Sequence, residues 1–132
     1  MQLPVHPHLM VLRTLITLEL SLLIGQAGWA SAGLGRDPGW FRLHAGFALP
    51  TLLGAWLCLI AYLLLRRTAG PVCVGLAGLL AAMAAAQFAL GELAVPDVHI
   101  FLGVLTLMVA TALTSWTYRL PGPVARRLPD RA

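Results

Sequence analysis

Long apolar stretches separated by short polar segments make up most of the chain. Four of these stretches are about 20 residues long or longer, at about 10–30, 42–65, 71–92 and 97–118. A helix of roughly 20 apolar residues is long enough to cross about 30 Å of hydrocarbon. The pattern therefore predicts an all-α protein in which four transmembrane helices form one bundle, a single domain over residues 1–120.

Composition places the chain in a membrane and excludes an ordinary soluble domain. Of its 132 residues, 59% are hydrophobic and 11% are charged, and the mean hydropathy is +0.84. A soluble domain needs a more polar surface than this composition allows. We therefore expect membrane lipid to surround the bundle, in a bacterial plasma membrane.

All nine basic residues are arginines, and their positions predict the orientation of the helices. Arg13 lies near the start of the first stretch, Arg66 and Arg67 lie between the second and the third, and four more follow the fourth. Basic residues in short loops are retained on the cytoplasmic side. We therefore expect both termini in the cytoplasm, with residues 121–132 as a short basic tail. This tail lacks interleaved aromatic residues and a recognisable binding motif, so we expect no nucleic-acid partner.

A cleaved signal peptide is the alternative interpretation of the first stretch. Its apolar run over residues 14–27 is followed by the small residues 30–32, as at a cleavage site. Glu19 and Gln26 are unusual in a targeting segment, and cleavage would leave a bundle of three spans. We therefore expect the first helix to stay in the protein.

Glycine and proline predict where the helices end or bend. The glycines at 25, 28, 33 and 35 break helix continuity, so we expect the first helix to end near residue 31. Pro50 removes a helical donor and predicts a bend in the second helix. Small residues dominate the third stretch, which indicates close helix packing or room for a bulky flat ligand.

A polar pattern repeats in the two halves of the chain. In each half a glutamine precedes a histidine, and a Thr-Leu pair follows that histidine after seven residues. The repeated residues are Gln26, His44, Thr51 and Leu52 in the first half, and Gln87, His99, Thr106 and Leu107 in the second. Such a repeat matches the parallel repeats of membrane folds that arose by duplication.

His44 and His99 open the second and fourth helices, which run in the same direction through the membrane. Both imidazoles are therefore expected at the same depth, near the outer surface. Two neutral imidazoles on facing helices can ligate one haem iron from opposite sides. The other interpretation makes each histidine a hydrogen-bonded side chain at the membrane interface. The ligands do not distinguish haem b from haem O or haem A.

Glu19 and Gln26 lie seven residues apart and thus on roughly the same helix face. A charge in the middle of a span is costly, so Glu19 is expected to be protonated or paired. One interpretation makes both residues hydrogen-bonding groups that fix helix register. The other makes Glu19 a proton-handling group and Gln26 a partner of a ligating histidine, which needs an acceptor on its other nitrogen.

Arg42 lies two residues before His44, and Arg36 lies in the same outer segment. Haem propionates between the helices should point outward, where arginine pairs well with carboxylates. The alternative for Arg42 is an interfacial side chain that reaches toward water.

These residues resemble a known family. The segments "LELSLLIGQAGWASAG", "FRLHAGFALPTLL" and "VHIFLGVLTLMVATALT" are similar to one four-helix half of the heme A synthase family. The resemblance extends over residues 10–118 and rests mainly on His44, His99, the glycine-rich end of the first stretch and the spacing. Proteins of that family contain two such halves, each with histidines that open its second and fourth helices.

The resemblance implies that His44 and His99 ligate haem. In the family, one half binds the haem that is oxidised, and the other holds a haem b that relays electrons. The substrate-binding half carries a glutamate shortly before its first histidine and an arginine just after it, whereas here residues 41–43 read Phe-Arg-Leu and Ala45 follows. The outer-loop cysteines of many members are also absent. The chain is therefore more similar to the half that holds the cofactor.

The leading prediction is a haem-binding bundle that acts in electron transfer or in haem A maturation. An oxidoreductase reaction of the heme A synthase type would need two chains paired as a homodimer, and a respiratory complex is the other partner that we expect. Two alternatives remain open. One is a haem-free structural or assembly subunit of a membrane complex, and the other is a carrier or proton path that uses Glu19 and Gln87.

Overall fold

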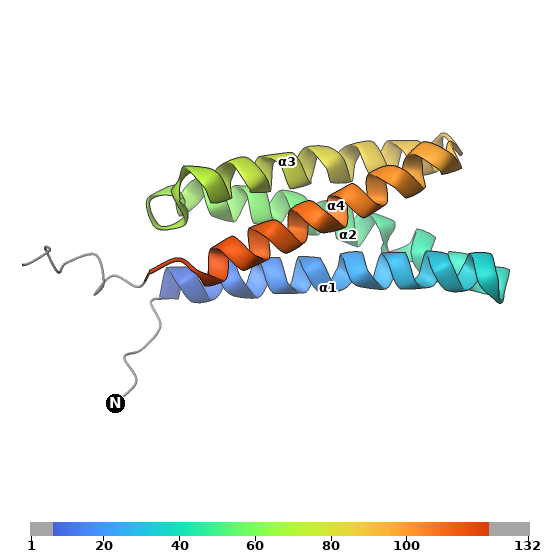
Figure 1. Ribbon diagram of the computed structural model, residues 1–132, viewed down its shortest axis with the longest axis horizontal. Helices are drawn as coiled ribbons and strands as arrows, with labels where there is room; N and C mark the ends of the chain where they lie inside the picture. Colours follow the sequence, from blue (N-terminus) through green and yellow to red (C-terminus); the bar gives the residue numbers. More distant parts are fainter. Residues whose placement is uncertain (1–6, 122–132) are drawn as a thin grey trace, which may run out of the picture.

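A computed structural model describes residues 7–121, which form an antiparallel bundle of four long helices (Figure 1). The elements are α1 (Pro7–Gly35), the 3-10 turn η1 (Pro38–Trp40), α2 (Phe41–Leu64), α3 (Arg66–Glu92) and α4 (Pro96–Tyr118). All four α-helices are long and apolar enough to span a membrane, and no strand occurs among the described residues. The prediction of an all-α bundle with four transmembrane helices is confirmed. Beyond Pro121, the predicted basic tail lies outside the described residues.

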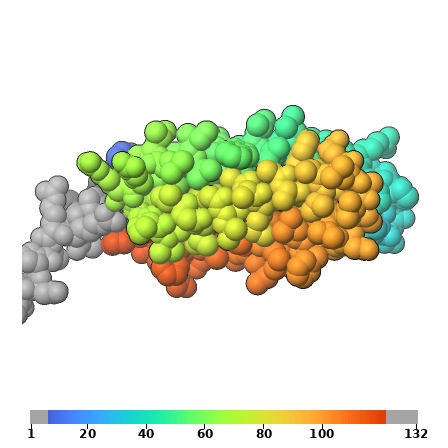
Figure 2. All heavy atoms as spheres, turned by 90° about the horizontal axis from the view of Figure 1, so that it is seen from above, coloured from blue at the N-terminus to red at the C-terminus, as the bar shows by residue number. Residues whose placement is uncertain are grey.

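The helices are arranged so that each packs against the next in the chain and α4 returns to α1. As a result α2 and α4 occupy diagonal corners of the bundle, and their backbones do not approach each other closely. Figure 2 shows α3 along the face between these two helices. The start of α1 and the end of α4 lie at the same end of the bundle, the terminal end, as Figure 1 shows. We call the opposite end, with the connections at residues 36–40 and 93–95, the hairpin end.

The first helix is longer than the sequence indicated. It continues through its glycines to Gly35, so the prediction that it ends near residue 31 was wrong. In a membrane, every backbone group must be bonded within the helix, which favours helix continuity even where glycine is frequent. Gly33 also has a packing role, because a Cβ there would lie 3.0 Å from ring carbons of Phe41. Helical structure continues on both sides of Pro50 in α2.

A backbone break occurs near the start of α3, at Gly70. This residue has φ 76° and ψ 166° and is followed by Pro71. A positive φ strongly favours glycine, and proline disfavours helical geometry in the residue before it. The continuous part of α3 therefore begins at Pro71, where the sequence predicted the third span to begin.

Small side chains fill the middle of the bundle. The buried residues there include Ala55, Ala77, Ala81, Ala84 and Ala110. Alanine allows helix backbones to approach closely, and close packing is the main attraction between helices in lipid. The close packing predicted from the third stretch is therefore present.

A buried polar contact joins α2 to α4 near the terminal end. The Thr117 hydroxyl donates to the Leu113 carbonyl at 2.7 Å, so the Tyr62 hydroxyl donates to Thr117 Oγ1 at 2.6 Å. Cys73 lies beside this pair, and Cys58 is also buried and free. This contact ties the diagonal helices together at the end of the bundle opposite the histidines.

Because Tyr62 donates the hydrogen bond to Thr117, we expect substitutions of these two residues to differ in their cost to stability. Thr117→Val should destabilise the bundle by about 1–3 kcal/mol, because it leaves the buried Tyr62 donor without a partner. Tyr62→Phe should cost about 1 kcal/mol, because Thr117 keeps its bond to the Leu113 carbonyl. Unfolding in mixed detergent micelles measures both. A larger loss for Tyr62→Phe than for Thr117→Val would contradict this assignment of donor and acceptor.

Candidate functional site

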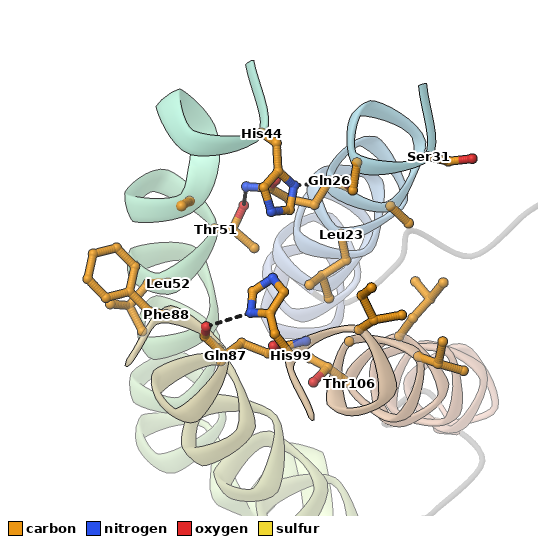
Figure 3. A pocket seen from close by; sticks show the side chains of 18 of the residues that line it. Leu23, Gln26, Ser31, His44, Thr51, Leu52, Gln87, Phe88, His99 and Thr106 are labelled. Carbon is orange, nitrogen blue, oxygen red and sulfur yellow. Dashed lines mark hydrogen bonds between the residues drawn. The ribbon is translucent and has the colours of Figure 1, made fainter. Parts of the chain in front are cut away.

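Two histidines face each other at the hairpin end. His44 lies in the first turn of α2 and His99 in the first turn of α4, so both enter the bundle at a similar depth. Their ring centroids are 5.8 Å apart and their planes are 84° from parallel. Figure 3 shows both rings in the space between the helices. Because α2 and α4 are diagonal, the pair spans the interior of the bundle rather than one helix interface.

A backbone carbonyl orients each imidazole. His44 Nδ1 lies 3.1 Å from the carbonyl oxygen of Gln26, and His99 Nδ1 lies 3.0 Å from that of Gln87. A carbonyl oxygen only accepts, so each Nδ1 carries the hydrogen and donates it. Each Nε2 therefore keeps a lone pair, which is the state in which histidine binds a metal.

The polar repeat of the sequence corresponds to a repeated arrangement in space. In both halves the histidine on the second helix of a hairpin donates to a glutamine carbonyl on the first helix. In both halves the threonine seven residues later donates back to the carbonyl four residues before it, at 2.7 Å for Thr51 and 2.8 Å for Thr106. The two helical hairpins thus present matching sets of groups to the centre.

The glutamine side chains distinguish the two halves. Gln26 Nε2 donates to Thr51 Oγ1 at 3.3 Å, whereas the amide of Gln87 lies against Gly103. A Cβ at position 103 would come within 2.7 Å of Gln87 Nε2, so glycine leaves the room that this amide occupies. The Oε1 atoms of Gln26 and Gln87 are both buried and have no hydrogen-bond partner within the described residues.

A cavity of about 610 Å³ surrounds the histidine pair, and all four helices line it. This volume lies within the range of sites that hold cofactors and small molecules. Apolar side chains form most of the wall, and polar atoms come from few residues. The polar side chains are Gln26, Ser31, His44, Thr51, Gln87, His99 and Thr106. Such a wall suits a largely apolar ligand held at a small number of polar points.

The donor set suits a metal in a macrocycle better than a bare metal ion. Within residues 7–121, no group of three or more His, Cys, Asp or Glu side chains could hold a metal ion. Zinc sites use three or four protein ligands. A haem iron needs only two axial ligands, and two bonds of about 2 Å each place the imidazole centroids roughly 6 Å apart. The separation of 5.8 Å between His44 and His99 fits that requirement.

The other predicted site residues are placed differently. Gln26 lines the cavity, and it is its main chain that orients His44. Arg42 is exposed at the start of α2 and is not among the residues that line the cavity, so its pairing with a propionate stays a prediction. Phe88 and Gly103 line the cavity and were missed in the sequence. The sequence could have identified both, because Phe88 follows Gln87 directly and Gly103 lies one helical turn after His99.

Glu19 lies between the cavity and the terminal end. Its side chain is 1% exposed, and neither carboxyl oxygen has a hydrogen-bond partner within the described residues. Its Oε2 occupies the place that a Cβ on Gly54 of α2 would take. Leu23 and Thr51, one helical turn from Glu19 and Gly54, line the cavity. Glu19 thus sits directly beyond the cavity wall.

Comparisons of the chain with family models, with curated proteins and with solved structures find no match. The resemblance to the heme A synthase family therefore stays a prediction that rests on the quoted segments.

Proposed function

We propose that the protein is an integral membrane haem protein that holds one haem b between His44 and His99. The observation that carries this proposal is the facing pair of imidazoles, 5.8 Å apart, with each Nδ1 bonded to a main-chain carbonyl. That arrangement leaves a lone pair on the Nε2 of each histidine, and both histidines line the same cavity. The integral membrane location itself follows from four helices that can span a membrane.

Three parts of the bundle have a task in this proposal. The carbonyls of Gln26 and Gln87 fix the tautomer and the ring orientation of the two ligands. The apolar wall excludes water and lowers the local dielectric constant. The packed terminal half of the bundle fixes the distance between α2 and α4, through contacts such as the Tyr62–Thr117 bond. A bound haem would supply a reversible one-electron couple at this site.

We further propose that the hairpin end faces the outside of a bacterial plasma membrane. Arg13, Arg66, Arg67 and Arg119 belong to the terminal end, and the positive-inside rule favours the cytoplasm for that end. Haem propionates would then leave the hydrocarbon near Arg42. Two activities fit this orientation. One is electron transfer to a respiratory-complex partner, and the other is haem A maturation by a homodimer that restores two halves.

A visible spectrum of the purified protein tests the proposal. Protein produced with ample haem and purified in detergent should show, in the reduced-minus-oxidised difference, the sharp bands of six-coordinate low-spin haem. Pyridine extraction of the pigment should identify haem b and give about one haem per chain. A spectrum without haem bands would reject the proposal and favour a haem-free structural or assembly subunit.

Alanine at position 26 or 87 should leave the spectrum intact. His44 and His99 donate to main-chain carbonyls, which every residue supplies, so Gln26→Ala and Gln87→Ala keep both acceptors. We expect haem occupancy within about twofold of the wild type, because the lost Gln26–Thr51 bond is long at 3.3 Å. Occupancy is measured from the haem-to-protein absorbance ratio. Loss of haem from either variant would assign the orienting role to the side-chain amide instead.

A further inference from the structure

Glu19 is the one charged residue in the middle of the four helices. No other Asp, Glu, Lys or Arg occurs within residues 14–35, 43–65, 68–91 and 98–118. The side chain is 1% exposed, and both carboxyl oxygens lack a hydrogen-bond partner among the described residues. Buried polar groups are nearly always bonded, so this carboxyl calls for a physical explanation.

Packing gives the Glu19 carboxyl a defined place. Gly54 on α2 carries no side chain, and Oε2 occupies the space that a Cβ there would need. In such surroundings the neutral acid is favoured, and the anion becomes favourable when a positive charge lies near. A cation site does not account for the carboxyl, because no cluster of further acidic, thiol or imidazole ligands exists within residues 7–121.

A change of charge on a group held in the cavity would occur close enough to Glu19 to affect its ionisation. Leu23 and Thr51 line the cavity and lie one helical turn from Glu19 and Gly54. Gln26, which orients His44, is seven residues further along α1, or about 10 Å along the helix axis. Across a low-dielectric interior, charges at such a distance still interact appreciably.

We propose that Glu19 binds one proton when the group held by the two histidines is reduced, and releases it on oxidation. This proposal rests on the proposed haem function. When a one-electron donor such as a reduced dye mediator reduces a haem held by His44 and His99, the site would lose one positive charge. One proton from water then binds to a carboxylate oxygen of Glu19, so the net charge of the interior is restored. Oxidation reverses both transfers.

The neighbouring helices offer no better proton acceptor. On α2 the titratable side chains beyond His44 are Cys58 and Tyr62. On α3 the corresponding side chain is Cys73, and α4 has none between His99 and Tyr118. The thiols and the phenol are neutral acids at neutral pH. On α1, the nearest charged group is Arg13, which bonds the Tyr118 carbonyl at 3.2 Å at the terminal end.

A redox titration over a series of pH values tests this proposal. The midpoint potential of the wild type should fall with rising pH, with a slope that approaches about 59 mV per pH unit for one proton and one electron. This slope is expected only over a limited pH range. The range lies between the pH at which Glu19 is half-titrated in the oxidised protein and the pH at which it is half-titrated in the reduced protein. Glu19→Gln keeps the shape and removes the titratable proton, so its potential should be independent of pH in that range. Asp37→Asn, at an exposed carboxyl in the α1–α2 connection, should keep the wild-type slope.

Infrared difference spectra supply a second measurement. The reduced-minus-oxidised spectrum of the wild type should contain a protonated-carboxyl stretch that is missing in Glu19→Gln and kept in Asp37→Asn. A slope that persists in Glu19→Gln would assign the proton to another group, such as a haem propionate, and overturn the proposal. If the wild type has normal haem bands but a midpoint potential that does not change with pH, this proposal is overturned as well. The proposed haem function would remain intact in that case. Absence of haem bands in the wild type would overturn both.

Discussion

Replacement of either His44 or His99 with alanine should abolish the six-coordinate low-spin spectrum. Among the described residues, these two side chains supply the only imidazole nitrogens that line the cavity, and each would be a ligand of the haem. Loss of one ligand leaves at most a five-coordinate iron with the broad bands of a high-spin centre, and loss of both should release the haem. We expect haem occupancy of the purified double variant to fall at least tenfold. Visible spectra of the single and double variants, recorded at matched protein concentration, measure both the band shape and the haem occupancy.

His8→Ala is the matched control for these variants. His8 lies at the terminal end, where its Nδ1 is 3.5 Å from Thr68 Oγ1, far from the cavity along the bundle. Its removal should leave the haem spectrum unchanged. Equal loss of haem from His8→Ala would mean that the bands depend on the fold or on nonspecific binding. Full retention of the low-spin bands in His44→Ala would show that this residue is not a ligand.

Gly54→Ala should destabilise the bundle by about 1–3 kcal/mol, the usual cost of overpacking a tight interior. The new methyl group would need the space of Glu19 Oε2, and the carboxyl has no polar alternative nearby among the described residues. Gly75→Ala is the matched control, because a Cβ there meets nothing within 4 Å. The control should be neutral or slightly stabilising, since alanine is the better helix former. Unfolding in mixed detergent micelles gives the free energy for each variant.

A double-mutant cycle separates the steric effect from other effects at position 54. Glu19→Ala removes the carboxyl, so Gly54→Ala in that background should cost much less than it does alone. We expect a coupling free energy of about 1 kcal/mol or more, which is typical of residues in direct contact. Additive effects of the two substitutions would contradict the close contact between α1 and α2 at this point.

The fold was largely predictable because each helix crosses the membrane as one continuous apolar segment. Hydropathy alone located α2, α3 and α4 within a few residues. The end of α1 was misplaced, because glycine is a weaker helix breaker where the backbone cannot bond to water. The depth of His44 and His99 followed from their places at the starts of parallel helices.

The hydrogen bonds of the site were less predictable. One interpretation of the sequence made Gln26 a partner of a ligating histidine, but it did not identify the acceptor atom. The acceptor is the main-chain carbonyl, whose position depends on helix rotation. Helix rotation is set by packing in three dimensions and not by spacing along one helix. The room made by Gly103 for Gln87, and by Gly54 for Glu19, depends in the same way on the neighbouring helix.

The difference between the two hairpins has a stereochemical consequence. Four residues after the histidine, the first half has Ala48 and the second has Gly103, beside which the Gln87 amide lies. A porphyrin with unlike substituents has two distinguishable faces. One face would meet the wall of α2 with its Gln26–Thr51 bond, and the other would meet the wall of α4 with the Gln87 amide. A bundle of nearly equal halves can therefore bind such a ring in one facial isomer and not as an even mixture of two.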